Sequence, residues 1–339
     1  MAASIKDVAQ KAGCSIATVS RVLAGKGYIS DKARQEVEAA VKELGYRPNR
    51  VAQNLRAQKS RVIGLVLSDI CNPFFSEISR AVERIVSKQG YNVLICNTDE
   101  DPQKEAHYLK LLGEEQVAGI LLSPTRASAK SFDGSTLPPV VLFDRKFPKA
   151  LLDSVVIDNA DASLRLTTTL LEGGCKKIAG IFGAKSYTAA ERIDGFKAAF
   201  AGQENRMAGI HQSPAFEEEG NRLMKQLLAD DPDIDGVVCS SGLLATGAYK
   251  AIRECGLKIP SDIGFVCFDD PVWAGFVEPG ITVIRQPAEA IGEAAAELLM
   301  KRIENSERPV SEICLQGDLV RRTSTQLMEK DRCDDGFAH

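Results

Sequence analysis

Histidine is scarce in this chain of 339 residues, and the three that occur lie far apart, at His107, His211 and His339. No H-E-x-x-H sequence or triad-like spacing surrounds them, and no G-x-G-x-x-G sequence follows the first apolar run. The motifs of the common metal-dependent, nucleophilic and dinucleotide-dependent enzymes are therefore missing. We expect no enzyme and no cofactor.

Long apolar runs are missing as well. No stretch reaches the roughly 18 apolar residues that a transmembrane helix needs. The first residues, Met1 to Ser4, lead straight into a polar helical pattern instead of a signal sequence. We expect a cytoplasmic protein with no membrane partner.

The nine cysteines are odd in number and scattered, and no two of them form a C-x-x-C pair. Most stand in apolar stretches that are typical of strands or helices. We expect reduced thiols in the core, and neither a zinc site nor a redox pair.

Charge is divided unevenly along a chain whose composition, 44% hydrophobic and 26% charged, is ordinary for two or three domains. Residues 1–61 hold twelve lysines and arginines against five acidic residues, a net charge of +7. Because the whole chain carries −4, residues 62–339 carry −11. A basic head on an acidic body is suited to binding phosphate without general adhesion to nucleic acid.

Residues 5–23 have the pattern of a helix-turn-helix. Apolar residues between Ile5 and Ala12 recur at a spacing of three and four, and Gly13 can adopt the left-handed conformation that ends a helix. Ser15 then caps a second helix. Helix pairs of this kind also occur in all-α cores that never contact DNA, so the basic charge of the head is what favours DNA binding.

The second helix has two different sides. Val19, Val22 and Leu23 fall on one side and are expected to pack inward. On the other side Arg21 can offer two donors to guanine, while small apolar and hydroxyl side chains can reach thymine methyl groups, base edges or phosphates. We predict DNA contacts in the major groove by Ser15, Ile16, Ala17, Thr18, Ser20 and Arg21.

Three segments carry a resemblance to a known family. Ile5 to Ala9, Thr18 to Leu23 and Leu44 to Asn49 resemble the head of the lactose/galactose repressor (LacI/GalR) family, and further matches cover nearly the whole chain. The resemblance implies that residues 49–60 form a hinge helix that orders on operator DNA, with Asn49 and Leu55 contacting the DNA. Leu55 matches the leucine that the family places in the minor groove, where an apolar wedge bends the duplex. Without the resemblance, a plain linker with one incidental leucine is the simpler interpretation.

From Val62 onward short apolar runs alternate with amphipathic helical patterns, which predicts parallel sheets covered on both faces. The alternation restarts at Val155 to Ile157, and two successive runs predict two doubly wound halves. Ligands in such sheets bind at the carboxyl ends of strands, so we expect a site in the cleft between the halves. Polar residues follow the apolar runs at Asp69, Asn97, Asp144, Asp158-Asn159 and Asp269-Asp270. Each of these could instead be a helix cap or a turn residue.

The family resemblance ranks these candidates. It implies that Phe74 and Phe75 form an apolar wall, that Asp144 and Asp269 accept hydroxyl groups, and that Arg192, in the R-x-x-G-[FYW] segment, reaches the effector. Phe216 and Ser241 are further expected contacts, although the chain departs from the family there. Ser240-Ser241-Gly242 replaces a frequent Asn-Asp, and Ala215 stands where an aromatic residue is usual. Fewer acids beside a retained Arg192 would suit a sugar acid, so the expected effector is a sugar or a sugar acid.

The sequence thus predicts an all-α helix-turn-helix head (1–48), a hinge or linker (49–60), and a body for effector binding and dimerisation (61–325). The resemblance implies that the body consists of two α/β subdomains of the periplasmic-binding-protein type. The polar tail (326–339) lacks leucine heptads, which favours a homodimer over a tetramer. We predict a repressor of a carbohydrate-utilisation operon that binds near-palindromic double-stranded operator DNA. The alternative is a solute-binding protein of the same body fold, for which a basic head would serve no purpose.

Overall fold

The computed structural model describes residues 3–24, 29–46, 60–126, 132, 134, 136–147, 152–184 and 186–325. The chain divides into two compact units, residues 1–60 and 61–339, and each is described by itself.

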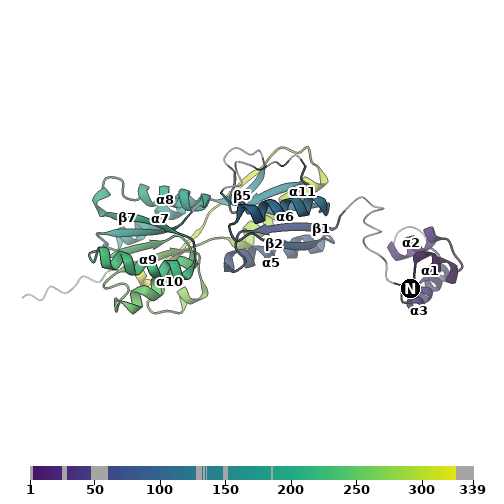
Figure 1. Cartoon of the computed structure of the whole chain (residues 1–339), viewed down its shortest axis with the longest axis horizontal. Coiled ribbons are helices and arrows are strands. Elements are labelled where there is room, and N and C mark those ends of the chain that lie inside the picture. The colour runs from purple at the N-terminus through teal and green to yellow at the C-terminus, as the bar shows by residue number, and fades with distance from the viewer. Residues whose placement is uncertain are drawn as a thin grey trace, which may run out of the picture. The chain divides into compact units, whose positions relative to one another are not determined.

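The described residues of the first unit form three helices, α1 (Ile5–Lys11), α2 (Ile16–Ala24) and α3 (Asp31–Leu44) (Figure 1). Val8, Val19 and Val37, one from each helix, are fully buried and form the centre of its core. The ends of the helices are those that the sequence predicts: Ser30 accepts a hydrogen bond from the Ala33 amide, and Gly45 ends α3 at φ +58°.

The second unit begins with a six-stranded parallel sheet in the order β11-β5-β4-β3-β1-β2. Helices α5 (Pro73–Lys88) and α11 (Ala288–Glu304) cover one face, and α6 (Pro102–Glu114) covers the other. The strands are β1 (Val62–Leu67), β2 (Asn92–Asn97), β3 (Gly119–Leu122), β4 (Val140–Phe143), β5 (Asp153–Ile157) and β11 (Glu312–Leu315).

A second six-stranded sheet has the order β12-β10-β9-β8-β6-β7 and is parallel except for β12, which runs antiparallel to β10. Figure 1 shows α7 (Asn159–Glu172) and α8 (Tyr187–Ala198) on one face, and α9 (Glu217–Asp230) and α10 (Gly242–Glu254) on the other. The strands are β6 (Ile178–Gly183), β7 (Met207–Ser213), β8 (Gly236–Cys239), β9 (Gly264–Phe268), β10 (Thr282–Arg285) and β12 (Asp318–Val320).

The two halves are interleaved, so the prediction that a second half starts at Val155 is wrong. Residues 155–157 belong to β5, which pairs with β4 in the first sheet. The chain then enters the second half, returns to the first for α11 and β11, and leaves again for β12. It therefore passes between the halves three times, at residues 157–159, 285–288 and 315–318, which we call the first, second and third crossovers. An alternating pattern specifies a parallel sheet without specifying which sheet a strand joins, and this explains the error.

Arg302, near the end of α11, helps to hold α11 and β11 against the first sheet. Its guanidinium donates to the buried carboxylate of Asp153 in β5, with an Nε–Oδ2 distance of 2.8 Å and an Nη2–Oδ1 distance of 3.1 Å. Asp153 also accepts a hydrogen bond from the Ser311 amide just before β11. The carboxylate thus fixes α11 and the start of β11 beside β5.

The eight cysteines that the structure describes are free thiols. Cys96, Cys175, Cys239 and Cys267 are buried as expected, and burial raises the pKa of each thiol. The prediction of a core position is wrong for Cys71, Cys255 and Cys314, which are exposed in a loop, a helix end and an edge strand. Within the described ranges, no helix is long and apolar enough to cross a membrane.

Candidate functional site

The outer face of α2 is the candidate DNA interface. Val19 is fully buried, whereas Ile16 is 38% exposed and Ala17, Ser20 and Arg21 are exposed as well. The Ser15 hydroxyl accepts a hydrogen bond from the Thr18 amide at 3.1 Å and bonds the Thr18 hydroxyl at 2.9 Å. Ser15 therefore caps α2 as expected, and it fixes the first turn of the exposed face.

Arg21 is the longest side chain on this face. Its Nε donates to the Ala17 carbonyl oxygen at 3.3 Å, so the guanidinium lies along the helix surface and within reach of solvent. The predicted contacts at Asn49 and Leu55 lie outside the described residues.

In the second unit, Asp144 and Asp269 occupy equivalent places in the two sheets. Each follows a buried phenylalanine at the end of its strand, Phe143 of β4 and Phe268 of β9. Each also has a left-handed backbone, with φ values of +64° and +66°. Only a few per cent of non-glycine residues adopt this conformation, and it recurs at functional sites.

Asp144 is buried next to two basic groups. Its Oδ2 accepts hydrogen bonds from the Arg145 Nε at 3.1 Å and from the Ser123 hydroxyl at 3.4 Å. Burial raises the pKa of the Asp144 carboxyl, and the positive charges of Arg145 and Arg192 counteract only part of that effect.

Arg145 is tied at its other end to Glu100, which precedes α6. The two guanidinium Nη atoms donate to the two carboxylate oxygens of Glu100 at 2.9 and 2.6 Å. Burial disfavours the charge of Arg145, yet Glu100 and Asp144 outweigh burial and raise the pKa of the guanidinium. Arg145 therefore stays charged beside Asp144.

Arg192 of α8 is only 6% exposed. It donates from Nε to Asn159 Oδ1 at 2.7 Å, from Nη1 to the Ser240 carbonyl oxygen at 2.6 Å, and from Nη2 to Gln286 Oε1 at 3.2 Å. Its guanidinium carbon lies 3.9 Å from the centre of the Phe268 ring. Burial lowers the pKa of Arg192, and Asp269 and Asp144 offset part of that shift, so these three predicted site residues influence one another electrostatically.

The glycine of the R-x-x-G-[FYW] segment has a packing role. A Cβ atom at Gly195 would lie 2.0 Å from the Ala160 carbonyl oxygen. Gly195 therefore lets α8 approach α7 closely, and this approach places Arg192 beside Asn159 at the start of α7.

The other predicted effector contacts occupy different surroundings. Phe74 and Phe75 are buried, and the Phe75 ring lies 6.4 Å from that of Phe143, which precedes Asp144. Phe216 is 55% exposed at the start of α9. The Ser241 hydroxyl caps α10 by accepting from the Leu244 amide at 3.3 Å, while the neighbouring Ser240 contacts Arg192.

Sequence reasoning missed Arg145 and Gln286, named Asn159 only as one of several polar residues at strand ends, and did not expect Glu191 to take part. Asn159 follows a strand and Gln286 precedes a proline, yet nothing in the pattern indicates that both reach Arg192, 33 and 94 positions away. Among the other candidates, Asp69 accepts from the Cys71 amide and Asp158 caps α7. For these two the turn or cap role is the observed one.

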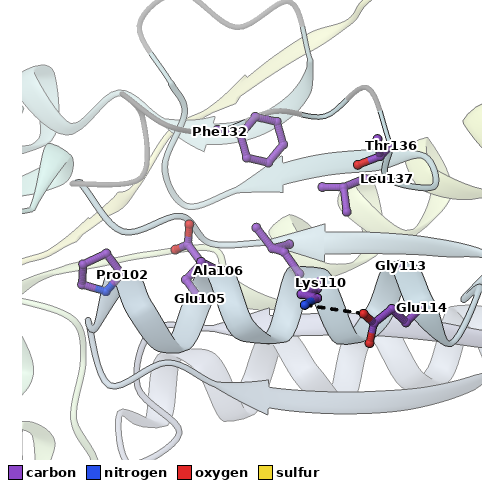
Figure 2. A pocket seen from close by; sticks show the side chains of 10 residues that line it. Pro102, Glu105, Ala106, Lys110, Gly113, Glu114, Phe132, Thr136 and Leu137 are labelled. Atoms are coloured by element: carbon purple, nitrogen blue, oxygen red, sulfur yellow. Dashed lines mark ion pairs between the residues drawn. The ribbon is translucent and has the colours of Figure 1, made fainter.

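A cavity of about 460 Å³ lies elsewhere, between α6 and the side chains of Phe132, Thr136 and Leu137 (Figure 2). Its lining includes Leu109, Phe132 and Leu137, and the ion pair of Lys110 with Glu114 lies at its edge. None of the predicted effector contacts lines it. Among the described residues, no three His, Cys, Asp or Glu side chains are grouped so as to hold a metal ion.

Comparison with known proteins finds a matching family for each of the two units. The family described as bacterial regulatory proteins of the lacI family matches residues 4–49, and the one described as periplasmic binding proteins and sugar binding domain of the LacI family matches residues 60–322. The chain belongs to the LacI family of bacterial transcriptional regulators. The predicted family and fold class are thereby confirmed.

Relatives in the LacI family match along nearly their whole length. The ribose operon repressor of Halalkalibacterium halodurans is 40% identical over 326 residues, which cover 95% of this chain and 97% of the relative. The transcriptional repressor CytR of Escherichia coli is 34% identical over 340 residues, with coverage of 96% and 97%. These relatives are DNA-binding regulators and not enzymes.

Solved structures of LacI-family regulators share the fold. The complex of the regulator CelR with cellobiose superposes with a TM-score of 0.71 at 28% identity, over 95% of this chain and 99% of that one. The lac repressor dimer bound to operator and an anti-inducer superposes with a TM-score of 0.86 at 24% identity, over 97% and 100%.

Proposed function

We propose that this protein is a homodimeric repressor that binds a near-palindromic operator and is controlled by a small sugar bound beside Asp144, Arg192 and Asp269. The observation that carries the proposal is the division of α2, whose inner face packs against α1 and α3 while its outer face leaves Ile16, Ala17, Ser20 and Arg21 exposed. A helix presented in this way on a head of net charge +7 fits the major groove. Operator binding implies action in the cytoplasm, where bacterial DNA lies.

On the DNA, we assign Arg21 to a guanine and Ile16 with Ala17 to thymine methyl groups, while Ser15, Thr18 and Ser20 contact base edges or phosphates. Asn49 and Leu55 remain proposed contacts of the hinge, with Leu55 in the minor groove.

Arg192 and Asp144 have hydrogen-bonding groups that no described residue uses and that could bind the hydroxyl groups of a sugar. A guanidinium carries five N–H groups, and within the described part of the chain three of those of Arg192 are used. No described residue donates to Asp144 Oδ1, so that oxygen can accept a hydroxyl group. Phe74, Phe75, Phe216 and Ser241 complete the proposed site, with aromatic rings against the apolar side of the sugar.

The charges around the site favour a neutral sugar over a sugar acid. Among the described residues, the main basic neighbours of Asp144, Asp269, Glu191 and Glu100 are Arg145, Arg192 and Lys146. An added carboxylate would meet an excess of negative charge. Since the relative at 40% identity is named a ribose operon repressor, D-ribose is the first candidate.

We further propose that the effector acts on DNA binding through the crossovers, because Arg192 contacts the first at Asn159 and the second at Gln286. The operator affinity changes only as far as the effector prefers one arrangement of the two halves.

The experiment has two steps. Thermal unfolding of the full chain is measured with neutral sugars, including D-ribose, and with sugar acids, because a ligand at about 100 times its Kd adds about 2.7 kcal/mol of stability. Selection of bound fragments from random duplex DNA then yields the operator. A near-palindromic consensus and stabilisation by a neutral sugar support the proposal. The absence of any selected sequence contradicts its DNA-binding part and favours a solute-binding protein.

A further inference from the structure

The surroundings of Arg192 show how its charge is compensated. Within the described residues, no carboxylate bonds to the guanidinium directly, and its three acceptors are a backbone carbonyl and two side-chain amides. Each of these amides also donates to a carboxylate. Gln286 Nε2 donates to Asp269 Oδ1 at 2.6 Å, and Asn159 Nδ2 donates to Glu191 Oε2 at 2.9 Å.

The orientation of both amides follows from Arg192. A guanidinium has donors only, so each amide must turn its oxygen toward Arg192 and its nitrogen away. The nitrogens then point at the two carboxylates. The result is one continuous hydrogen-bonded path, Asp269–Gln286–Arg192–Asn159–Glu191, in which Gln286 and Asn159 are buried and lie on the second and first crossovers.

We propose that Asn159 and Gln286 are positioning residues that hold Arg192 for effector binding while keeping it out of a direct ion pair. This inference rests on the proposed function for the identity of the bound molecule, but the path itself is tested without any ligand. A carboxylate in either place would capture the guanidinium and compete with an effector hydroxyl for it. A neutral amide fixes the guanidinium and leaves its charge available. Because each amide belongs to a crossover, a shift of Arg192 toward an effector displaces both chain segments.

Several charged groups lie around this path. Asp269 after β9, Asp144 and Arg145 after β4, and Glu191 of α8 all act on Arg192. Lys146 acts on Glu191, which is solvent-exposed. Asp269 is half-buried, so it is the carboxylate that responds most strongly to a change in its amide partner.

The decisive variant is Gln286→Glu, which keeps the shape of the side chain and replaces Nε2 by an oxygen. That oxygen would face Asp269 Oδ1 at the present 2.6 Å, and two carboxylates at this distance cannot both be ionised. The introduced carboxyl therefore has a higher pKa in the folded chain than in the unfolded chain. Its contribution to stability is present at low pH and is lost as the pH rises through the folded-state pKa.

The measurement is thermal unfolding of the full chain from pH 5 to 9, with each variant compared to the wild type at the same pH. We expect Gln286→Glu to unfold about 5 °C below the wild type at pH 9, and the gap to close toward pH 5 as the protonated carboxyl again donates to Asp269. For Asn159→Asp we expect the unfolding temperature to fall below that of the wild type in the same pH-dependent way but by a smaller amount, because Glu191 is exposed. A gap that is absent, or constant across the pH range, overturns the proposal.

Two controls separate positioning from packing. Gln286→Ala removes the same amide without adding a titratable group, so its gap is independent of pH. Asn221→Asp changes another amide that donates to a glutamate, Glu254 at 3.4 Å, but at an exposed site, and its gap stays below about 1 °C. Equal pH dependence in Asn221→Asp and Gln286→Glu overturns the proposal.

D-ribose as the probe then tests the link to binding. We expect Gln286→Glu to weaken D-ribose binding at least about tenfold at pH 8, with a smaller loss at pH 6. Unchanged D-ribose affinity in the variant overturns the positioning role. If the wild type itself does not bind D-ribose, the sugar assignment of the proposed function fails, while the unfolding data still decide the path.

Discussion

At the scale of single residues, the two aspartates with left-handed backbones are the centre of the proposed effector site. The sequence marks both as polar residues directly after apolar runs. The family resemblance selects them over Asp69 and Asp158, and the structure shows that these last two serve as turn and cap. Their partners could not be predicted, because Gln286 and Glu100 lie 17 and 45 positions from the aspartates or arginines they contact. Such contacts depend on how the crossovers fold.

We predict that Asp144→Asn becomes more stable relative to the wild type as the pH rises. Burial raises the pKa of Asp144 in the folded chain, so its contribution to stability is present at low pH and is lost as the pH rises through that pKa. Asparagine tolerates the φ of +64°. Urea unfolding of both proteins between pH 4 and 8 checks this. A stability difference that does not change with pH would show that the carboxylate carries no burial cost.

We predict that Arg21→Ala relaxes base choice at one position in each half-site. A bidentate contact to guanine contributes about 1–3 kcal/mol of discrimination against the other bases at that position. Its loss should leave the preference at the other positions of the half-site unchanged. Binding to a set of operators with single substitutions measures this effect. Equal weakening on every sequence would instead make Arg21 a phosphate contact.

At the scale of helices and strands, local signals predicted most elements. The apolar periodicity, the caps at Ser15 and Ser30 and the stop at Gly45 agree with the head as observed. Strands β7 and β10 were missed. The first is an edge strand in which five residues are half-buried, Gln212 is exposed and Ser213 is buried, and the second has only four residues, so neither shows a strong apolar run.

We predict that Gly195→Ala destabilises the body by about 1–3 kcal/mol, because the added Cβ would lie 2.0 Å from the Ala160 carbonyl oxygen and force α7 and α8 apart. The matched control is Gly113→Ala in α6, where the Cβ would lie 3.6 Å from the Leu137 side chain. Alanine favours a helix over glycine, so the control gains up to about 1 kcal/mol. Urea unfolding measures both changes, and changes of equal sign would refute the packing role of Gly195.

At the scale of the whole molecule, the interleaved connectivity was beyond the sequence pattern. Strand β5 reads like the start of a new half, yet the burial of all five of its residues between β4 and β11 is satisfied only in the first sheet. The return of α11 depends on contacts such as that of Arg302 with Asp153, which are 149 positions apart. Local periodicity carries no information at this range.

We predict that the body dimerises through exposed apolar side chains and that Phe276→Asp yields monomers. Phe276 is 83% exposed, and Val272 of the same segment is exposed too. Large exposed apolar groups of this kind mark interaction surfaces. Sedimentation velocity compares this variant with Phe216→Asp, which alters another exposed phenylalanine assigned to the effector site and should leave the dimer intact. Dimers in both variants would exclude the Phe276 surface.

The central claim is that a sugar bound in the body controls DNA binding by the head. Its most direct test is the affinity of the full chain for the selected operator, measured by fluorescence anisotropy with and without the sugar that stabilises the protein against unfolding. We predict a change in Kd of at least about tenfold, the ordinary size of an allosteric coupling. An operator affinity that stays the same while that sugar is bound would contradict the claim.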